Sequence, residues 1–98
     1  MHVISRKTLI EFWAREPKAK LLLQAWWAEA CKAHWKSPKD VKARFASADI
    51  VGNDRIVFDI GGNKYRLIAR INFRSETVFI RFVGTHSEYD RIKDVGKI

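Results

Sequence analysis

The chain has 98 residues, enough for one domain with a modest hydrophobic core and too few for two. Its 19 Lys and Arg residues against 11 Asp and Glu residues give a net charge of +8, which predicts an attraction to polyanions that weakens as the salt concentration rises. A single cysteine, Cys31, excludes an internal disulfide, and no signal-peptide core or apolar run of about 18 residues is present, so we expect a cytoplasmic protein with no membrane partner.

The first 45 residues have helical spacing after a short opening strand at residues 2–4. The hydroxyl of Ser5 is placed to cap a helix, and Pro17 predicts the first turn of a second helix, where its missing N–H costs nothing. Ser37 followed by Pro38 predicts a third, short helix that ends near Phe45. The apolar sides of the first two helices are expected to contain Leu9, Phe12, Trp13, Leu22, Leu23, Trp26, Trp27 and Ala30.

From Ala46 onward the pattern changes to the alternation typical of strands, with turns at residues 52–54 and 61–62 and a two-residue hairpin tip at residues 75–76. In these registers Asp59 faces Lys64, and Arg70 lies directly opposite Arg81. The predicted core face of the last hairpin contains Tyr65, Leu67, Ala69, Ile71, Phe73, Val78, Ile80 and Phe82, with Val83 on the opposite face.

The expected element order is β-α-α-α-β-β-β-β, all within one domain that spans residues 1–98. This order predicts an α+β fold in which the N-terminal helices pack on one face of a twisted antiparallel sheet. The other face of the sheet is expected to stay open.

That open face is basic. Like charges that face each other across strands destabilise a sheet, so Arg70 opposite Arg81 predicts an anionic ligand, with phosphate as the leading candidate. Neighbouring aromatic side chains could stack on unpaired bases. An ordinary solvated sheet face is the alternative interpretation. The basic candidates are Arg55, Lys64, Arg66, Arg70, Arg74 and Arg81.

A second candidate is the segment GTHSEYD at residues 84–90, where the last predicted strand leaves the sheet. A histidine such as His86 can exchange a proton near neutral pH, while Tyr89 and Asp90 could orient it, stack on a base or assist proton transfer. Plain turn and capping roles are an equally good interpretation of these residues.

Other chemically active residue types favour structural roles. The four tryptophans have helical spacing and predict core positions, with an exposed partner-binding edge as the alternative. Cys31 is expected to be buried or inert. His2 and His34 lack the spacing of metal ligands, so we expect no metal and no cofactor.

Two longer segments carry a family resemblance. Residues 40–73 contain NKYRL, and residues 78–92 contain GTHSEYD. Both segments resemble the HigB toxins of bacterial toxin-antitoxin pairs, a branch of the RelE-like mRNA interferases. The resemblance implies a small RelE-like fold that cleaves mRNA in the translating ribosome, and a helix-turn-helix antitoxin, HigA, that neutralises the toxin and through which the complex can bind operator DNA.

For the chemistry, the resemblance implies that a ribose 2′-hydroxyl attacks the adjacent phosphate without a metal, giving a 2′,3′-cyclic phosphate and a 5′-hydroxyl. Our hypothesis is that Arg66 and Arg81 hold the phosphate, His86 is the general acid or base, and Tyr89 positions a base or assists proton transfer. Lys64 completes the expected catalytic group. The expected RNA contacts are Arg55, Arg70, Arg74, Asp90 and Lys93.

Two other classes of function remain open on the sequence. A non-catalytic module that binds RNA or DNA would use the same basic face. A protein-interaction domain built on the tryptophan-rich helices would show no salt-dependent association with RNA.

Overall fold

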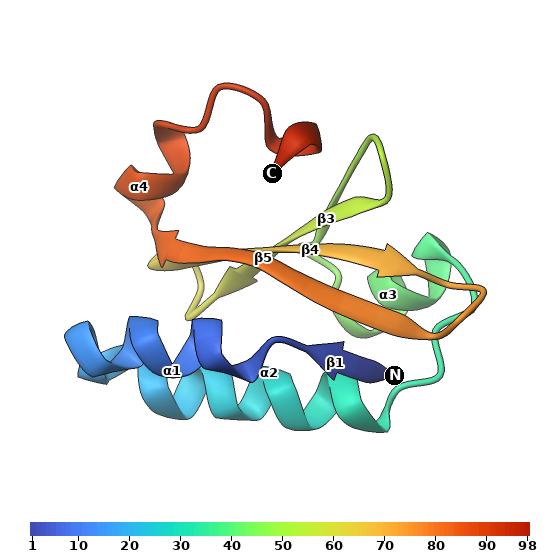
Figure 1. Cartoon of the computed structure of the whole chain (residues 1–98), viewed down its shortest axis with the longest axis horizontal. Helices are drawn as coiled ribbons and strands as arrows, with labels where there is room; N and C mark the ends of the chain where they lie inside the picture. Colours follow the sequence, from blue (N-terminus) through green and yellow to red (C-terminus); the bar gives the residue numbers. More distant parts are fainter.

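The computed structural model describes residues 1–98 as a five-stranded sheet with chain on both of its faces. The strands are β1 (His2–Ile4), β2 (Asp49–Val51), β3 (Arg55–Ile60), β4 (Tyr65–Asn72) and β5 (Thr77–Thr85), in the spatial order β1-β5-β4-β3-β2. The helices are α1 (Arg6–Arg15), α2 (Lys20–Lys32), α3 (Pro38–Arg44) and α4 (His86–Asp90), with short 3₁₀ helices η1 (Pro17–Ala19) and η2 (Val95–Lys97). Helices α1 and α2 lie along one face, and α4 with the C-terminal residues lies over the other (Figure 1).

The predicted α+β class is confirmed, with two differences. The sheet is mixed, because β1 pairs in parallel with β5 and only the other neighbours are antiparallel. The connection between this parallel pair is long, because α1, α2, α3 and the strands β2 to β4 all lie between β1 and β5 in the chain. The chain also adds α4 and η2 after β5, which the predicted order lacks. None of the helices combines the length and apolar character needed to cross a bilayer.

The main core lies between the helices and the sheet. Trp26 of α2 packs edge-to-face on Phe58 of β3, with ring centroids 5.3 Å apart, and Phe12 of α1 packs similarly on Tyr65 of β4 at 5.7 Å. Trp26 and Trp35 are buried, while Trp13 and Trp27 pack against the core from its margin, so the predicted core role of the tryptophans is confirmed.

Two capping predictions on the helices are wrong, and so is the burial of Cys31, one of the two alternatives expected for it. Ser5 and Ser37 stand at the helix N-caps, but neither side chain accepts a capping hydrogen bond. At the start of α3, the Asp40 carboxylate accepts the Lys36 N–H at 2.8 Å, which stabilises this turn from another position. Cys31 is exposed, because it lies on the solvent side of α2.

The β4–β5 hairpin has a longer turn than predicted. Pairing begins at Asn72 opposite Thr77, so residues 73–76 form the turn, and the Asn72 side-chain oxygen accepts a main-chain N–H inside it at 3.0 Å. The change of register places Arg70 opposite Phe79. The predicted pairing of Arg70 with Arg81 is therefore wrong.

A β-bulge follows in the same hairpin. Between Ile68 and Ala69 the register shifts, and Arg81 becomes the extra residue on β5. The inward and outward alternation is reversed beyond the bulge, so Val83 faces the core, where it is buried, and Phe82 faces outward opposite Ile68. The prediction had exchanged the faces of these two β5 residues.

The β3–β4 turn is also longer than expected. Gly61 and Gly62 have φ angles of 65° and 70°, which glycine adopts without strain, but the turn extends to Lys64. Asp59 consequently faces Arg66, not Lys64 as predicted. A pair of like charges does face each other across strands, but it consists of Arg55 and Arg70.

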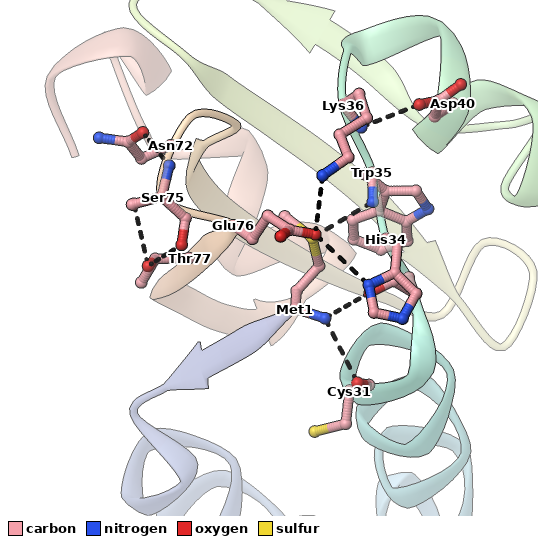
Figure 2. Close-up of polar contacts among 11 residues, drawn as sticks. Met1, Cys31, His34, Trp35, Lys36, Asp40, Asn72, Ser75, Glu76 and Thr77 are labelled. Atoms are coloured by element: carbon pink, nitrogen blue, oxygen red, sulfur yellow. Dashed lines mark hydrogen bonds and ion pairs between the residues drawn. The ribbon is translucent and has the colours of Figure 1, made fainter.

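The β4–β5 turn is fixed to the segment between α2 and α3 (Figure 2). The Glu76 carboxylate lies 3.4 Å from Nζ of Lys36 and 3.4 Å from Nδ1 of His34. Both side chains lower the pKa of Glu76, with the His34 hydrogen bond the largest cause. These contacts anchor the end of the hairpin that lies farthest from α4.

Candidate active site

The face of the sheet turned away from α1 and α2 is called the outer face below. Val57 and Ile68 pair across β3 and β4 at its centre and are only 1% and 0% exposed, although they lie outside the main core cluster. The chain after β5 passes over this face (Figure 1). The predicted open face is therefore wrong at its centre, because the C-terminal segment covers it. Outward-facing side chains are Arg55, Val57, Asp59, Arg66, Ile68, Arg70, Phe79 and Phe82.

Helix α4 is fixed at its start by a reciprocal cap. The Thr85 hydroxyl accepts the Glu88 N–H at 3.1 Å, and the Glu88 carboxylate accepts the Thr85 N–H at 2.8 Å. Arg15 of α1 donates to the other Glu88 oxygen at 3.0 Å. The Thr85 N–H is the largest cause of the lowered pKa of Glu88, and Arg15 adds to it. Side chains at the end of β5 and on α1 thus both hold α4 in place.

His86 stands at the first position of α4. Its Nε2 lies 3.6 Å from the Asp90 carboxylate one turn later, and its Nδ1 is buried with no hydrogen-bond partner. Its main-chain N–H donates to the Lys64 carbonyl at 3.1 Å, which places α4 against the β3–β4 turn. His86 and Asp90 are therefore brought together, whereas Lys64 contacts His86 only through its main chain and its side chain is exposed.

Arg66 is the one buried charged residue, 8% exposed. Its Nε lies 3.1 Å from the Asp59 carboxylate, and its Nη atoms donate to the Asn63 side chain and to the Tyr65 carbonyl. The guanidinium carbon lies 5.9 Å from the ring centroid of Tyr89. Arg66 is thus held rigidly under the Tyr89 ring.

The charges of three carboxylates act on Tyr89. Burial is the largest cause that raises its pKa, followed by the charge of Asp49, with smaller effects from Asp59 and Asp90. Arg66 opposes them by lowering the pKa. The phenol therefore keeps its proton well into the alkaline range and can act as a donor at neutral pH. We call Lys64, Arg66, His86, Tyr89 and Asp90 the α4 cluster.

Arg55 and Arg81, called the arginine pair, lie apart from this cluster. Both donate to the main-chain oxygen of Ile98. The structure does not bring Arg66 and Arg81 onto one ligand, because their guanidinium groups have separate partners.

The remaining basic candidates are exposed. Arg70 lies over the Phe79 ring at 5.9 Å on the outer face, Arg74 lies in the β4–β5 turn, and Lys93 follows α4. They add positive charge around the two groups without joining either one.

Sequence reasoning missed Asp59 and Asn63, the two side chains that hold Arg66. The register error of two residues concealed Asp59, because it placed Lys64 opposite this carboxylate. Sequence reasoning also missed the contact between the arginine pair and the main-chain oxygen of Ile98. Residues 91–98 have no periodic pattern that could have predicted this contact.

Residues 19–92 match the model of a family described as the RelE-like toxic component of a toxin-antitoxin system. The chain belongs to the HigB toxin family. This HigB-family chain is 37% identical over 92 residues to the mRNA interferase toxin HigB of Escherichia coli K12, which covers 92% of the chain and 88% of the relative. It is 30% identical over 94 residues to the mRNA interferase HigB of Escherichia coli O6:H1 strain CFT073, covering 94% and 91%. The resemblance found in the sequence is confirmed, and every candidate site residue of this HigB-family chain except Lys93 lies within the matched range.

Replacing Asp59 with asparagine is expected to destabilise the HigB fold by about 2 kcal/mol, because the buried Arg66 charge loses its counter-ion. Thermal unfolding should show a Tm lower by roughly 10 °C. The matched control is Glu29→Gln, which breaks the exposed pair with Arg44 and should leave the Tm nearly unchanged. Equal Tm values for the two variants would contradict a structural role for the Asp59 pair.

Proposed function

We propose that this chain is the mRNA interferase of a toxin-antitoxin pair, an endoribonuclease that cuts mRNA in the translating ribosome. The α4 cluster carries this proposal. It places a histidine, a protonated tyrosine and a buried arginine side by side at one end of a basic sheet face. These groups match the needs of phosphodiester cleavage, namely proton transfer and stabilisation of negative charge.

In the proposed reaction, the ribose 2′ oxygen attacks the adjacent phosphorus while the bond to the 5′ oxygen breaks. His86, paired with Asp90, accepts the proton of the 2′-hydroxyl. Tyr89 supplies a proton to the leaving 5′ oxygen, and Arg66 beneath its ring offsets the charge that this step leaves on the phenol. The products are a 2′,3′-cyclic phosphate and a 5′-hydroxyl. Protein side chains alone perform every proton transfer.

Dependence on the ribosome is supported by the shape of the site. The two hollows on the surface lie at α2 with α3 and at α1 with β5, and neither is lined by His86 or Tyr89. A site outside any such hollow does little to orient a flexible strand, and orientation can supply a large part of the reduction in a reaction barrier. The ribosome would supply this orientation by holding the mRNA. This proposed substrate also places the chain in the cytoplasm.

The family supports an antitoxin as the second partner. We propose a HigA-type helix-turn-helix protein that neutralises the chain and through which the complex binds operator DNA. Co-expression of such a protein should restore growth. The protein should also co-purify with the chain.

The function is tested with purified chain, programmed ribosomes and mRNA. We expect cuts within translated codons that carry cyclic-phosphate and 5′-hydroxyl ends, and far fewer cuts on naked RNA. Intact mRNA together with salt-sensitive binding would favour a non-catalytic nucleic-acid module. Equal cleavage of naked RNA would overturn the dependence on the ribosome.

A further inference from the structure

The C-terminal residues 94–98 are held against the outer face by side chains from two strands and a turn. Arg55 on β3 donates to the main-chain oxygen of Ile98 from Nη2 at 2.7 Å and from Nε at 3.3 Å. Arg81 on β5 donates from Nε to the same oxygen at 3.3 Å. Asn53, in the β2–β3 turn, donates to the Gly96 carbonyl at 3.2 Å.

The convergence on one oxygen depends on the sheet order and on the bulge. Strand β4 separates β3 from β5, so the arginine pair reaches the oxygen from the two sides of the central strand. Arg81 is the extra residue of the β-bulge, and bulges can redirect a side chain in this way. Arg55 is fixed further by a bond from Nη1 to the Asn53 carbonyl at 2.8 Å.

Three guanidinium N–H groups directed at a single oxygen make a site suited to an anion. Guanidinium groups bind phosphate and carboxylate oxygens through short, charge-assisted hydrogen bonds. Neither Arg55 nor Arg81 forms an ion pair with a carboxylate side chain, and Arg70, opposite Arg55, forms none either. No carboxylate side chain therefore neutralises the positive charge of these three arginines.

We infer that the arginine pair forms a subsite for a non-bridging oxygen of an RNA phosphodiester, and that residues 94–98 occupy this subsite in the free chain. This inference rests on the proposed function, which identifies the ligand as the strand that the α4 cluster cleaves. RNA and the C-terminal residues then compete for the same two guanidinium groups, and the segment must leave the outer face before RNA binds there.

The segment is attached in a way that permits it to leave. Its own main-chain hydrogen bonds are local, from Lys97 to Asp94 and from Ile98 to Val95, and η2 is capped by the Asp94 side chain. It therefore departs without breaking the hydrogen bonds between strands. Segments held by few such bonds belong to the least stable parts of a fold.

The test compares the full chain with one that ends at Lys93. The deletion removes one acidic and one basic side chain, Asp94 and Lys97, so the net side-chain charge is unchanged. We expect the shortened chain to bind a short 2′-O-methyl RNA, which cannot be cleaved, about tenfold more tightly at fixed salt. Fluorescence anisotropy measures the affinity, and circular dichroism verifies the fold.

A second variant keeps the test decisive if the shortened chain fails to fold. Asn53 has a φ of 60°, which glycine tolerates, so Asn53→Gly removes the bond to Gly96 without backbone strain. We expect it to bind the same RNA about two- to threefold more tightly. Adding Arg55→Ala or Arg81→Ala to the shortened chain should abolish its gain, whereas Arg6→Ala, on the helical side, should leave most of it.

The outcomes separate this inference from the function on which it rests. Unchanged RNA affinity in both the shortened chain and Asn53→Gly would overturn the competition, even where ribosomal mRNA is still cut with cyclic-phosphate ends. A gain that survives without Arg55 and Arg81 would overturn the subsite. Absence of cleavage by the full chain would overturn the proposed reaction, while the binding of the uncleavable RNA still tests the subsite.

Discussion

Replacing Arg81 with alanine is expected to reduce mRNA cleavage on programmed ribosomes by about tenfold or more, because the RNA loses one charge-assisted contact to a phosphate. Arg81 is exposed on the outer face and donates only to a main-chain oxygen, so its loss should leave the fold intact. Growth inhibition after induction should be weaker for the variant than for the unaltered chain at equal protein level. Primer extension on a translated message measures the loss directly.

The matched control for Arg81 is Arg6→Ala. Arg6 is an equally charged, exposed residue on α1, where its guanidinium lies 5.8 Å from the Trp27 ring. It should retain nearly full toxicity, which separates a local role of Arg81 from the effect of net charge. Full toxicity of Arg81→Ala would contradict the proposed phosphate contact.

The second large effect is expected for Tyr89→Phe, which should slow cleavage about a hundredfold by removing one proton donor. The chain offers a closely matched control, because Tyr65 is its only other tyrosine and lies on the opposite face of the sheet. Tyr65→Phe removes a hydroxyl that donates to Glu16 at 3.4 Å, far from the reaction. Single-turnover cleavage rates should fall for Tyr89→Phe and stay near wild type for Tyr65→Phe.

The same pair of variants tests the protonation of Tyr89. Burial raises the pKa of both tyrosines above the ordinary value of 10.0. In the Tyr65→Phe background only Tyr89 titrates, so its ultraviolet absorbance change should occur above pH 10. Cleavage should accordingly not decline through Tyr89 ionisation below that pH. A tyrosinate signal near neutral pH would contradict the role of Tyr89 as a proton donor.

Periodicity predicted the helices and the inward face of β4, because one face of each element must be buried whatever its exact neighbours are. Tyr65 and Leu67 are buried as expected even though every predicted strand partner has changed. Register was not predictable in the same way. Turn length determines it, and here side-chain bonds such as that of Asn72 and a bulge at Arg81 changed both hairpins.

The same distinction between local and tertiary contacts applies to the residues of the candidate site. His86, Tyr89 and Asp90 have the three- and four-residue spacing that one helical turn brings together, and α4 does so. Arg66 and its partner Asp59 meet only through the strand register, and Arg81 meets Ile98 only through the path of the C-terminal chain. Contacts of the second kind depend on tertiary packing, which short sequence patterns do not record.

The lateral strands of the sheet have a consequence for how the chain behaves when it is alone. Both β1 and β2 are only three residues long, so the sheet presents very little unpaired backbone at either side. Short outermost strands are a recognised protection against the addition of strands from other molecules. Once released from an inhibitory partner, the chain can therefore persist as separate molecules without polymerising through its sheet.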